Sequence, residues 1–215
     1  MNLPNKLTLS RFALTGLFVG FMSSGWAGDG NSNQIVHRSG WLPHWNWAYT
    51  VALLIFLLCA ATDYLDGEIA RRRNLITNFG KLMDPLADKV MMAAGFICLV
   101  PMRAIPAWVA IVIIAREFLI TGLRLLAASK GQVLPAEKLG KHKVAWQIVT
   151  VCYFLLLLSL TEFAEAGHLP FASNQMWTYA WNYLGNTLLF IATTLTVYSG
   201  LGYFWKHRDL VAEMD

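Results

Sequence analysis

The stretch Val144–Thr161 reads VAWQIVTVCYFLLLLSLT and contains no charged side chain. A helix needs about 20 predominantly apolar residues to cross the hydrocarbon core of a membrane, and this run has nearly that length. A membrane-spanning β-strand would instead alternate apolar and polar residues over about 10 positions. The stretch therefore predicts a membrane-spanning α-helix rather than a strand of a transmembrane barrel.

The rest of the chain has the same apolar character. Of its 215 residues, 56% are hydrophobic and only 14% are charged, and the mean hydropathy is +0.47, which is far from the average of soluble domains. We predict an all-α integral membrane protein that forms a single domain over residues 1–215. Its six transmembrane helices are expected at Leu7–Ser24, Trp47–Arg71, Gly80–Pro101, Pro106–Ala128, Lys143–Thr161 and Tyr183–Trp205.

The basic residues predict how this bundle is oriented. If the six helices alternate in direction, twelve Lys and Arg residues fall on one side and only Arg38 and Arg103 on the other. Cytoplasmic flanks carry an excess of Lys and Arg, so both termini are expected in the cytoplasm, with Gly25–His44 and Glu162–Asn182 as external loops. The net charge of +4 reflects this orientation and an anionic membrane surface. It does not indicate nucleic-acid binding, because the chain has no recognisable nucleic-acid-binding module.

Four aspartates interrupt the apolar sequence in a regular pattern. Asp63 and Asp66 are three residues apart in the second predicted helix, and Asp84 and Asp88 are four apart in the third. These spacings place each pair on one helical face. In a hairpin of the two helices, Asp63 and Asp88 would each lie about 12 Å inside their helix ends, at about 1.5 Å per residue. We therefore expect the four carboxylates to converge at matched depths.

A cluster of this kind requires compensation. Carboxylates persist in or near hydrocarbon only where they are paired, hydrated or bound to a cation, and four together repel each other unless several are protonated or a multivalent cation lies among them. Oxygen ligands favour Mg²⁺, Mn²⁺ or Ca²⁺ over zinc. Structural ion pairs with the nearby basic residues are the alternative. They would not explain two acid pairs at equal depth beside the small residues Gly67, Ala70 and Gly80.

At these residues the chain resembles the CDP-alcohol phosphotransferase family. It matches all fixed positions of the family signature, namely Asp63, Asp66, Gly67, Ala70, Arg71, Gly80, Asp84 and Asp88. The resemblance implies six transmembrane helices with a polar, metal-binding cavity open to the cytoplasmic side, and a homodimer. It also implies an enzyme that moves a phosphate-bearing group from a CDP-linked donor to an alcohol and releases CMP.

The resemblance implies a role for each of these residues. Asp63, Asp66, Asp84 and Asp88 would hold Mg²⁺ or Mn²⁺, as two ions, and Asp88 would also be the general base. This agrees with physical chemistry, because two cations offset the charge of a diphosphate and a nearby carboxylate can take a hydroxyl proton. The CDP donor would contact Asp66, Gly67, Ala70, Arg71, Gly80, Asn5, Thr8 and Arg11. Asn5 and Thr8 could equally cap the first helix.

The fourth predicted helix contains candidates for binding an acceptor phosphate. Arg116 and Arg124 are eight residues apart, hence near one helical face, and guanidinium groups can grip a phosphate through two hydrogen bonds. Glu117 could orient one of these arginines or a hydroxyl. Lys138 and Lys141, with Lys143, either join this phosphate site or form an ordinary basic flank on the cytoplasmic side.

Three short motifs resemble those of phosphatidylglycerophosphate synthases within this family. They are Arg116-Glu-Phe, Gly122-Leu-Arg124 and Gly140-Lys-His-Lys143, and the start Leu3–Arg11 is similar as well. That resemblance implies CDP-diacylglycerol as donor, sn-glycerol 3-phosphate as acceptor and a location in the bacterial cytoplasmic membrane. Inositol phosphate, serine and phosphatidylglycerol are the alternative acceptors. A divalent-cation transporter is the alternative outside this family, although the aspartates are confined to the expected cytoplasmic halves of the helices.

Overall fold

The computed structural model describes residues 3–24, 47–73, 78–129, 138–165, 175–206 and 208. The described residues form six α-helices and no β-strand, which confirms the all-α prediction. The helices are α1 (Leu3–Ser24), α2 (Ala48–Arg73), α3 (Asn78–Leu99), α4 (Ala107–Ser129), α5 (Lys138–Glu165) and α6 (Gln175–Lys206).

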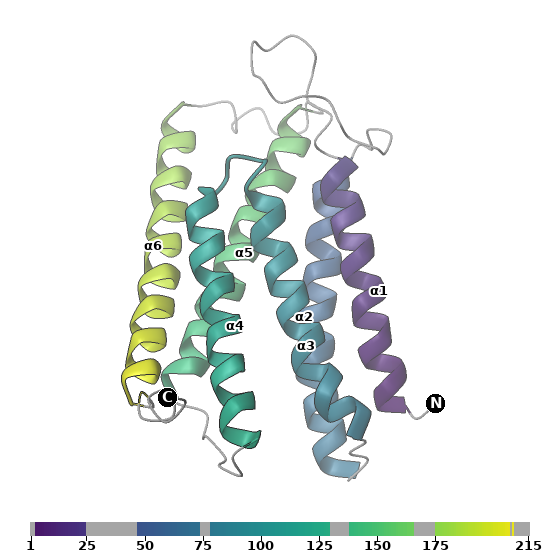
Figure 1. Ribbon diagram of the computed structural model, residues 1–215. Helices are drawn as coiled ribbons and strands as arrows, with labels where there is room; N and C mark the ends of the chain where they lie inside the picture. Colours follow the sequence, from purple (N-terminus) through teal and green to yellow (C-terminus); the bar gives the residue numbers. More distant parts are fainter. Residues whose placement is uncertain are drawn as a thin grey trace.

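The helices stand side by side and alternate in direction along the bundle (Figure 1). Helix α1 packs on α2 and α3, α5 packs on α2 and α6, and α4 bridges α3 and α6. The starts of α1, α3 and α5 and the ends of α2, α4 and α6 therefore share one end of the bundle, the lower end in Figure 1. Arg103, between α3 and α4, lies at the opposite end. The described helices thus alternate in direction, which is the condition under which the Lys and Arg residues fall mostly on one side.

The main core contains buried apolar side chains from all six helices. The rings of Phe18 and Phe56 pack with their centroids 5.9 Å apart, and both side chains are buried. Gly95 allows the close approach of three helices, since a Cβ at this position would lie 3.1 Å from Val151 and 3.2 Å from Phe56. This packing fixes how α3, the helix that carries Asp88, sits against α2 and α5.

Many large apolar side chains point away from the core. Ile111 on α4, Leu54 on α2 and Phe190 on α6 are all more than half exposed, and they belong to a much larger exposed apolar surface of a kind that marks contact with lipid or protein. Two helical stretches, His142–Ala164 and Trp181–Lys206, are long and apolar enough to cross a membrane. These features are those of a membrane protein.

The predicted helix boundaries were wrong at several ends. Helix α1 begins at Leu3, so Asn5 and Thr8 lie inside it and the capping alternative for them is wrong. The expected external loop Glu162–Asn182 is helical at both ends, because α5 runs to Glu165 and α6 begins at Gln175. The expected loop Gly25–His44 lies outside the described residues. The boundaries differ because hydropathy detects only the apolar part of a helix. The helix itself can continue through polar residues whose side chains have hydrogen-bond partners.

Glu162 is such a residue, and it joins the end of α5 to the start of α2. Its carboxylate accepts hydrogen bonds from the backbone N–H groups of Tyr49 at 2.8 Å and Thr50 at 3.0 Å. The Thr50 hydroxyl adds a contact of 3.1 Å to the same carboxylate. The first N–H groups of a helix have no partner within the helix, and the helix dipole favours a negative charge there. Glu162 therefore serves as an N-terminal cap supplied by another helix.

We expect Glu162→Ala to lower the free energy of unfolding by about 1–3 kcal/mol, because it leaves these N–H groups without their acceptor. The measurement is the unfolding midpoint of the purified protein in detergent. Thr161→Ala is the matched control, since Thr161 is exposed and its hydroxyl bonds only within α5, to Leu158. Equal midpoints for the two variants would contradict the capping role.

Candidate active site

The four aspartates lie on two antiparallel helices, Asp63 and Asp66 on α2 and Asp84 and Asp88 on α3. Asp63 precedes the last residue of α2 by ten positions (73 − 63), and Asp88 follows the first residue of α3 by ten (88 − 78). At about 1.5 Å per residue, both positions are about 15 Å from the same end of the bundle. The helix bounds thus agree with the matched depths predicted from the sequence.

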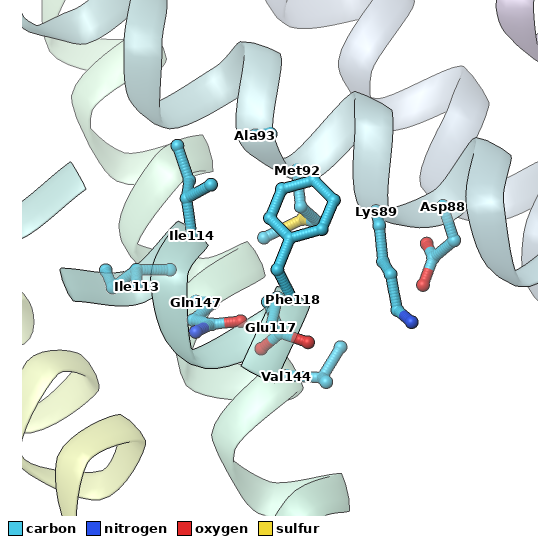
Figure 2. A pocket seen from close by; sticks show the side chains of 10 residues that line it. All are labelled: Asp88, Lys89, Met92, Ala93, Ile113, Ile114, Glu117, Phe118, Val144 and Gln147. Atoms are coloured by element: carbon cyan, nitrogen blue, oxygen red, sulfur yellow. The ribbon is translucent and has the colours of Figure 1, made fainter. Parts of the chain in front are cut away.

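Asp88 lines a small cavity between α3, α4 and α5 (Figure 2). Its volume is about 40 Å³, enough for water. In Figure 2, Asp88 and Lys89 lie at the right, and Glu117 lies nearer the centre, below the apolar side chain of Met92. The full lining consists of Asp88, Lys89, Met92, Ala93, Ile113, Ile114, Glu117, Phe118, Val144 and Gln147. A half-buried carboxylate therefore lies beside a solvent-sized space.

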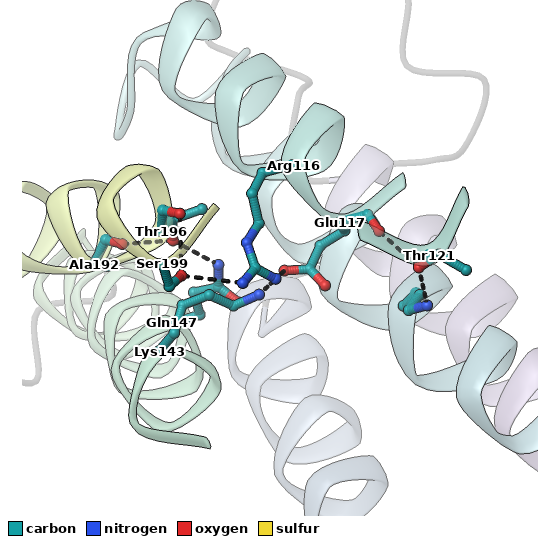
Figure 3. Close-up of polar contacts among 9 residues, drawn as sticks. Arg116, Glu117, Thr121, Lys143, Gln147, Ala192, Thr196 and Ser199 are labelled. Atoms are coloured by element: carbon teal, nitrogen blue, oxygen red, sulfur yellow. Dashed lines mark hydrogen bonds and ion pairs between the residues drawn. The ribbon is translucent and has the colours of Figure 1, made fainter. Parts of the chain in front are cut away.

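Glu117 contacts two cations, one on its own helix and one on α5 (Figure 3). Its Oε1 accepts a hydrogen bond from Nζ of Lys143 on α5 and lies 3.5 Å from Nη1 of Arg116. Lys143 is only 1% exposed, and an ammonium so deeply buried needs a partner of opposite charge. The Glu117 carboxylate thus neutralises Lys143 and contacts the guanidinium of Arg116 at the same time.

Arg116 and Arg124 both reach toward α6. Nη2 of Arg116 donates to Oγ of Ser199 at 3.0 Å, and Nε of Arg124 donates to the hydroxyl of Tyr203 at 3.4 Å. Gly200 is required by this packing, since a Cβ there would lie 2.8 Å from Cγ of Arg116. The two arginines therefore share the α6-facing side of α4, as their spacing predicted.

Lys89, the residue after Asp88, is held by α4. Its Nζ donates a hydrogen bond to Oγ1 of Thr121, and that hydroxyl in turn donates to the carbonyl oxygen of Glu117 at 2.7 Å. Lys89 and Thr121 are both half-buried. The turn of α3 that carries Asp88 is thus connected to the turn of α4 that carries Glu117.

The chain matches a known family over most of its length. The profile of the CDP-alcohol phosphatidyltransferase family matches residues 1–198, a range that includes every predicted site residue. The chain belongs to the CDP-alcohol phosphatidyltransferase family. The family membership predicted from the aspartate motif is thereby confirmed.

Three curated relatives show how similar the chain is to other proteins of this kind. A Bacillus subtilis protein is 40% identical over 208 residues, which cover 97% of this chain and 96% of the relative. Proteins of Rickettsia bellii and Pseudomonas fluorescens are 34% and 32% identical, over 73% and 96% of this chain and 78% and 92% of theirs. All three are named CDP-diacylglycerol--glycerol-3-phosphate 3-phosphatidyltransferase.

The remaining predicted site residues lie on α1, α2, α3 and α5. Gly67, Ala70 and Arg71 are in the last turns of α2, and Gly80 is the third residue of α3. Arg11 is buried on α1, which packs against both of those helices. Asn5 and Thr8 lie earlier on α1, and Lys138 and Lys141 lie in the first turn of α5.

For a metal, the structure describes only part of the predicted donor set. Among the described side chains, no three His, Cys, Asp or Glu residues lie together. The side chains of Asp63, Asp66 and Asp84 are outside that part of the chain, and the side chain of Asp88 is within it. Chemically the set fits Mg²⁺ or Mn²⁺, since all four ligands are carboxylates and these ions prefer oxygen.

The structure also corrects one interpretation and adds residues that the sequence reasoning missed. Lys143 is not part of a solvated basic flank, because it is buried against Glu117. The residues without a site role predicted from the sequence are Lys89, Thr121 and Ser199. The signal for Ser199 was available in α6, where polar residues recur every three positions at Thr193, Thr196 and Ser199 within an apolar segment. Such spacing indicates a polar stripe facing other helices.

Proposed function

We propose that this protein transfers the phosphatidyl group of CDP-diacylglycerol to sn-glycerol 3-phosphate, giving phosphatidylglycerophosphate and CMP. The observation that carries the proposal is the cavity shared by Asp88 and Glu117, because it joins a candidate base to the turn of α4 that bears Arg116. The choice of donor and acceptor is supported by the names of the relatives, one of them 40% identical over 97% of this chain.

In the proposed reaction, the primary hydroxyl of glycerol 3-phosphate attacks the lipid-side phosphorus of the donor. Asp88 accepts the hydroxyl proton as the new oxygen–phosphorus bond forms. The bond between that phosphorus and the oxygen bridging to CMP breaks, and CMP leaves with the bonding electrons. A positioned general base contributes about 10²–10⁴-fold to such a step, and the half-buried carboxylate of Asp88 lines a cavity large enough for water.

We assign two divalent ions, Mg²⁺ or Mn²⁺, to Asp63, Asp66, Asp84 and Asp88. When bound, such ions would offset the charge of the donor diphosphate and of the leaving CMP. The CDP moiety is assigned to the same end of the bundle, through residues on α1, α2 and α3. These are Asp66, Gly67, Ala70, Arg71, Gly80, Asn5, Thr8 and Arg11. Burial of Arg11 on the helix that contacts both α2 and α3 supports its inclusion.

The acceptor phosphate is assigned to Arg116 and Arg124, with Lys138 and Lys141 at the start of α5. Replacing Arg116 or Arg124 with Ala is expected to raise the KM for glycerol 3-phosphate about tenfold or more, because each removes a charge-assisted contact worth about 1.5–3 kcal/mol. The KM for CDP-diacylglycerol should change little. Arg103→Ala, at the opposite end of the bundle, is the matched control. An unchanged acceptor KM in both variants would remove the arginines from the acceptor site.

The proposed setting is a bacterial cytoplasmic membrane that all six helices cross, with both termini and the active site on the cytoplasmic side. Support comes from the alternating helix directions and from the basic residues at one end of the bundle. Single cysteines at Lys206 and Arg103, in a chain without other cysteines, test this in intact spheroplasts. A membrane-impermeant maleimide should label only the cysteine at 103. We also propose a homodimer, which light scattering of the detergent-solubilised protein would test.

The decisive assay measures CMP release by the purified protein with CDP-diacylglycerol and Mg²⁺. Glycerol 3-phosphate, inositol phosphate, serine and phosphatidylglycerol are supplied in parallel, and chelation of the metal serves as a further arm. Glycerol 3-phosphate should give the highest rate, and chelation should abolish it. A higher rate with another acceptor would retain the phosphatidyl transfer but overturn the acceptor. No release with any acceptor would overturn the enzymatic proposal and favour a non-enzymatic role such as cation transport.

A further inference from the structure

Lys89 is a charged side chain near the middle of α3, a helix that we place in the membrane. It follows the first residue of α3 by eleven positions (89 − 78), which is about 16 Å along the helix axis. An ammonium at this depth is expensive and is retained where it has a partner and a function. Lys89 lines the same cavity as Asp88 and Glu117 (Figure 2), so its partner bears on the site.

The partner of Lys89 is a hydroxyl with a fixed orientation. A threonine hydroxyl has one donor hydrogen and two acceptor lone pairs. Thr121 uses its hydrogen toward the carbonyl of Glu117 in its own helix, at 2.7 Å (Figure 3), so the lone pairs remain to accept from Nζ of Lys89. The contact between Lys89 and Thr121 therefore links α3 to α4 at one defined point.

We propose that Lys89 and Thr121 are positioning residues for Asp88, a role that rests on the proposed function. Asp88 and Lys89 are consecutive on α3, so fastening the Lys89 side chain to α4 fixes the rotation of the turn that carries Asp88. The Asp88 carboxylate is then held at the wall of the cavity that α3 shares with α4 and α5. A displacement of about 1 Å in a reacting group can reduce the rate by about 100-fold.

The first test replaces the hydroxyl alone. Thr121→Val keeps the shape of the side chain but removes the acceptor of Lys89, and we expect it to lower kcat about tenfold while both KM values stay within about twofold. Thr121→Ser, which retains the hydroxyl, should recover most of that loss. Thr187→Val is the matched control with wild-type kcat, because Thr187 is exposed and makes the same kind of bond within its helix, to Tyr183 at 2.8 Å. A purely structural role would instead lower the unfolding midpoint of Thr121→Val.

A double-mutant cycle tests whether the two residues act through one contact. Lys89→Met should lower kcat at least as much as Thr121→Val, and the double variant should be no slower than Lys89→Met alone. Such non-additivity is the mark of residues that act through their mutual contact. Additive losses, or a wild-type kcat for Thr121→Val, would overturn the proposal. An inactive wild-type protein would overturn the proposed function instead.

A readout without turnover separates these two failures. In a chain whose native cysteines are replaced with Ala, Asp88→Cys is labelled with a small methanethiosulfonate, and the rate is compared with and without Thr121→Val. Loss of the Thr121 hydroxyl should change the labelling rate at least threefold, and Thr187→Val should leave it unchanged. Equal rates in all three proteins would show that Thr121 does not position residue 88, whatever the activity of the enzyme.

Discussion

Replacing Asp88 with Asn is expected to lower kcat for phosphatidyl transfer by about 10²–10⁴-fold, the usual contribution of a general base. Asparagine has the same shape as aspartate but cannot accept the hydroxyl proton. Because Asp88 is only half-buried and lines a solvent-sized cavity, the exchange should leave the fold intact. The predicted loss is therefore chemical, and CMP release at saturating substrates measures it.

The control for Asp88→Asn is another carboxylate-to-amide exchange far from the site. Glu162→Gln is suitable because Glu162 lies near the end of α5 at the opposite end of the bundle and its amide oxygen can still accept a backbone hydrogen bond. It should retain the wild-type kcat. If Asp88→Asn instead turned over at nearly the wild-type rate with an unchanged unfolding midpoint, Asp88 would not be the base.

Replacing Glu117 with Gln is expected to destabilise the protein by about 3 kcal/mol or more. Lys143 is 1% exposed and is paired with the Glu117 carboxylate. Without that carboxylate the ammonium is buried and uncompensated, and breaking a buried pair in this way typically costs about 3–5 kcal/mol. The measurement is the unfolding midpoint in detergent, by heat or by titration with a denaturing detergent.

The Glu117→Gln/Lys143→Met double variant distinguishes lost charge balance from lost packing. With both charges removed, no uncompensated ion remains, and replacing a buried pair with apolar groups is often neutral or stabilising. The double variant should therefore recover most of the stability that Glu117→Gln loses. A double variant as unstable as the sum of the two single variants would show that the pair does not act as a unit.

The aspartate motif shows how far the sequence could predict the site. Spacings of three and four residues on two consecutive helices required the pairs to share helical faces, and the helix bounds then placed Asp63 and Asp88 at the same level. The eight-residue spacing of Arg116 and Arg124 likewise predicted a shared face. In the structure this face is directed toward α6, where Arg116 contacts Ser199 and Arg124 contacts Tyr203. These features follow from the regular geometry of single helices.

Lys143 shows where sequence reasoning ended. It follows Lys138 and Lys141 in a basic stretch, so its sequence context is that of a solvated flank. Whether such a side chain faces water or protein depends on how α5 is rotated against α4 and α6. That rotation is set by contacts between residues distant in sequence, such as Gln147 with Thr196 at 3.0 Å. Local patterns contain no information about those partners.

The sequence by itself determined the helical fold class and the family, because hydropathy and the aspartate spacing are properties of single segments and their order. The tertiary structure decided which polar groups meet. It placed Lys143 against Glu117, Lys89 against Thr121 and Glu162 at the start of α2. The physical reason is that a buried polar group must find a partner, and the available partners depend on which helices pack together.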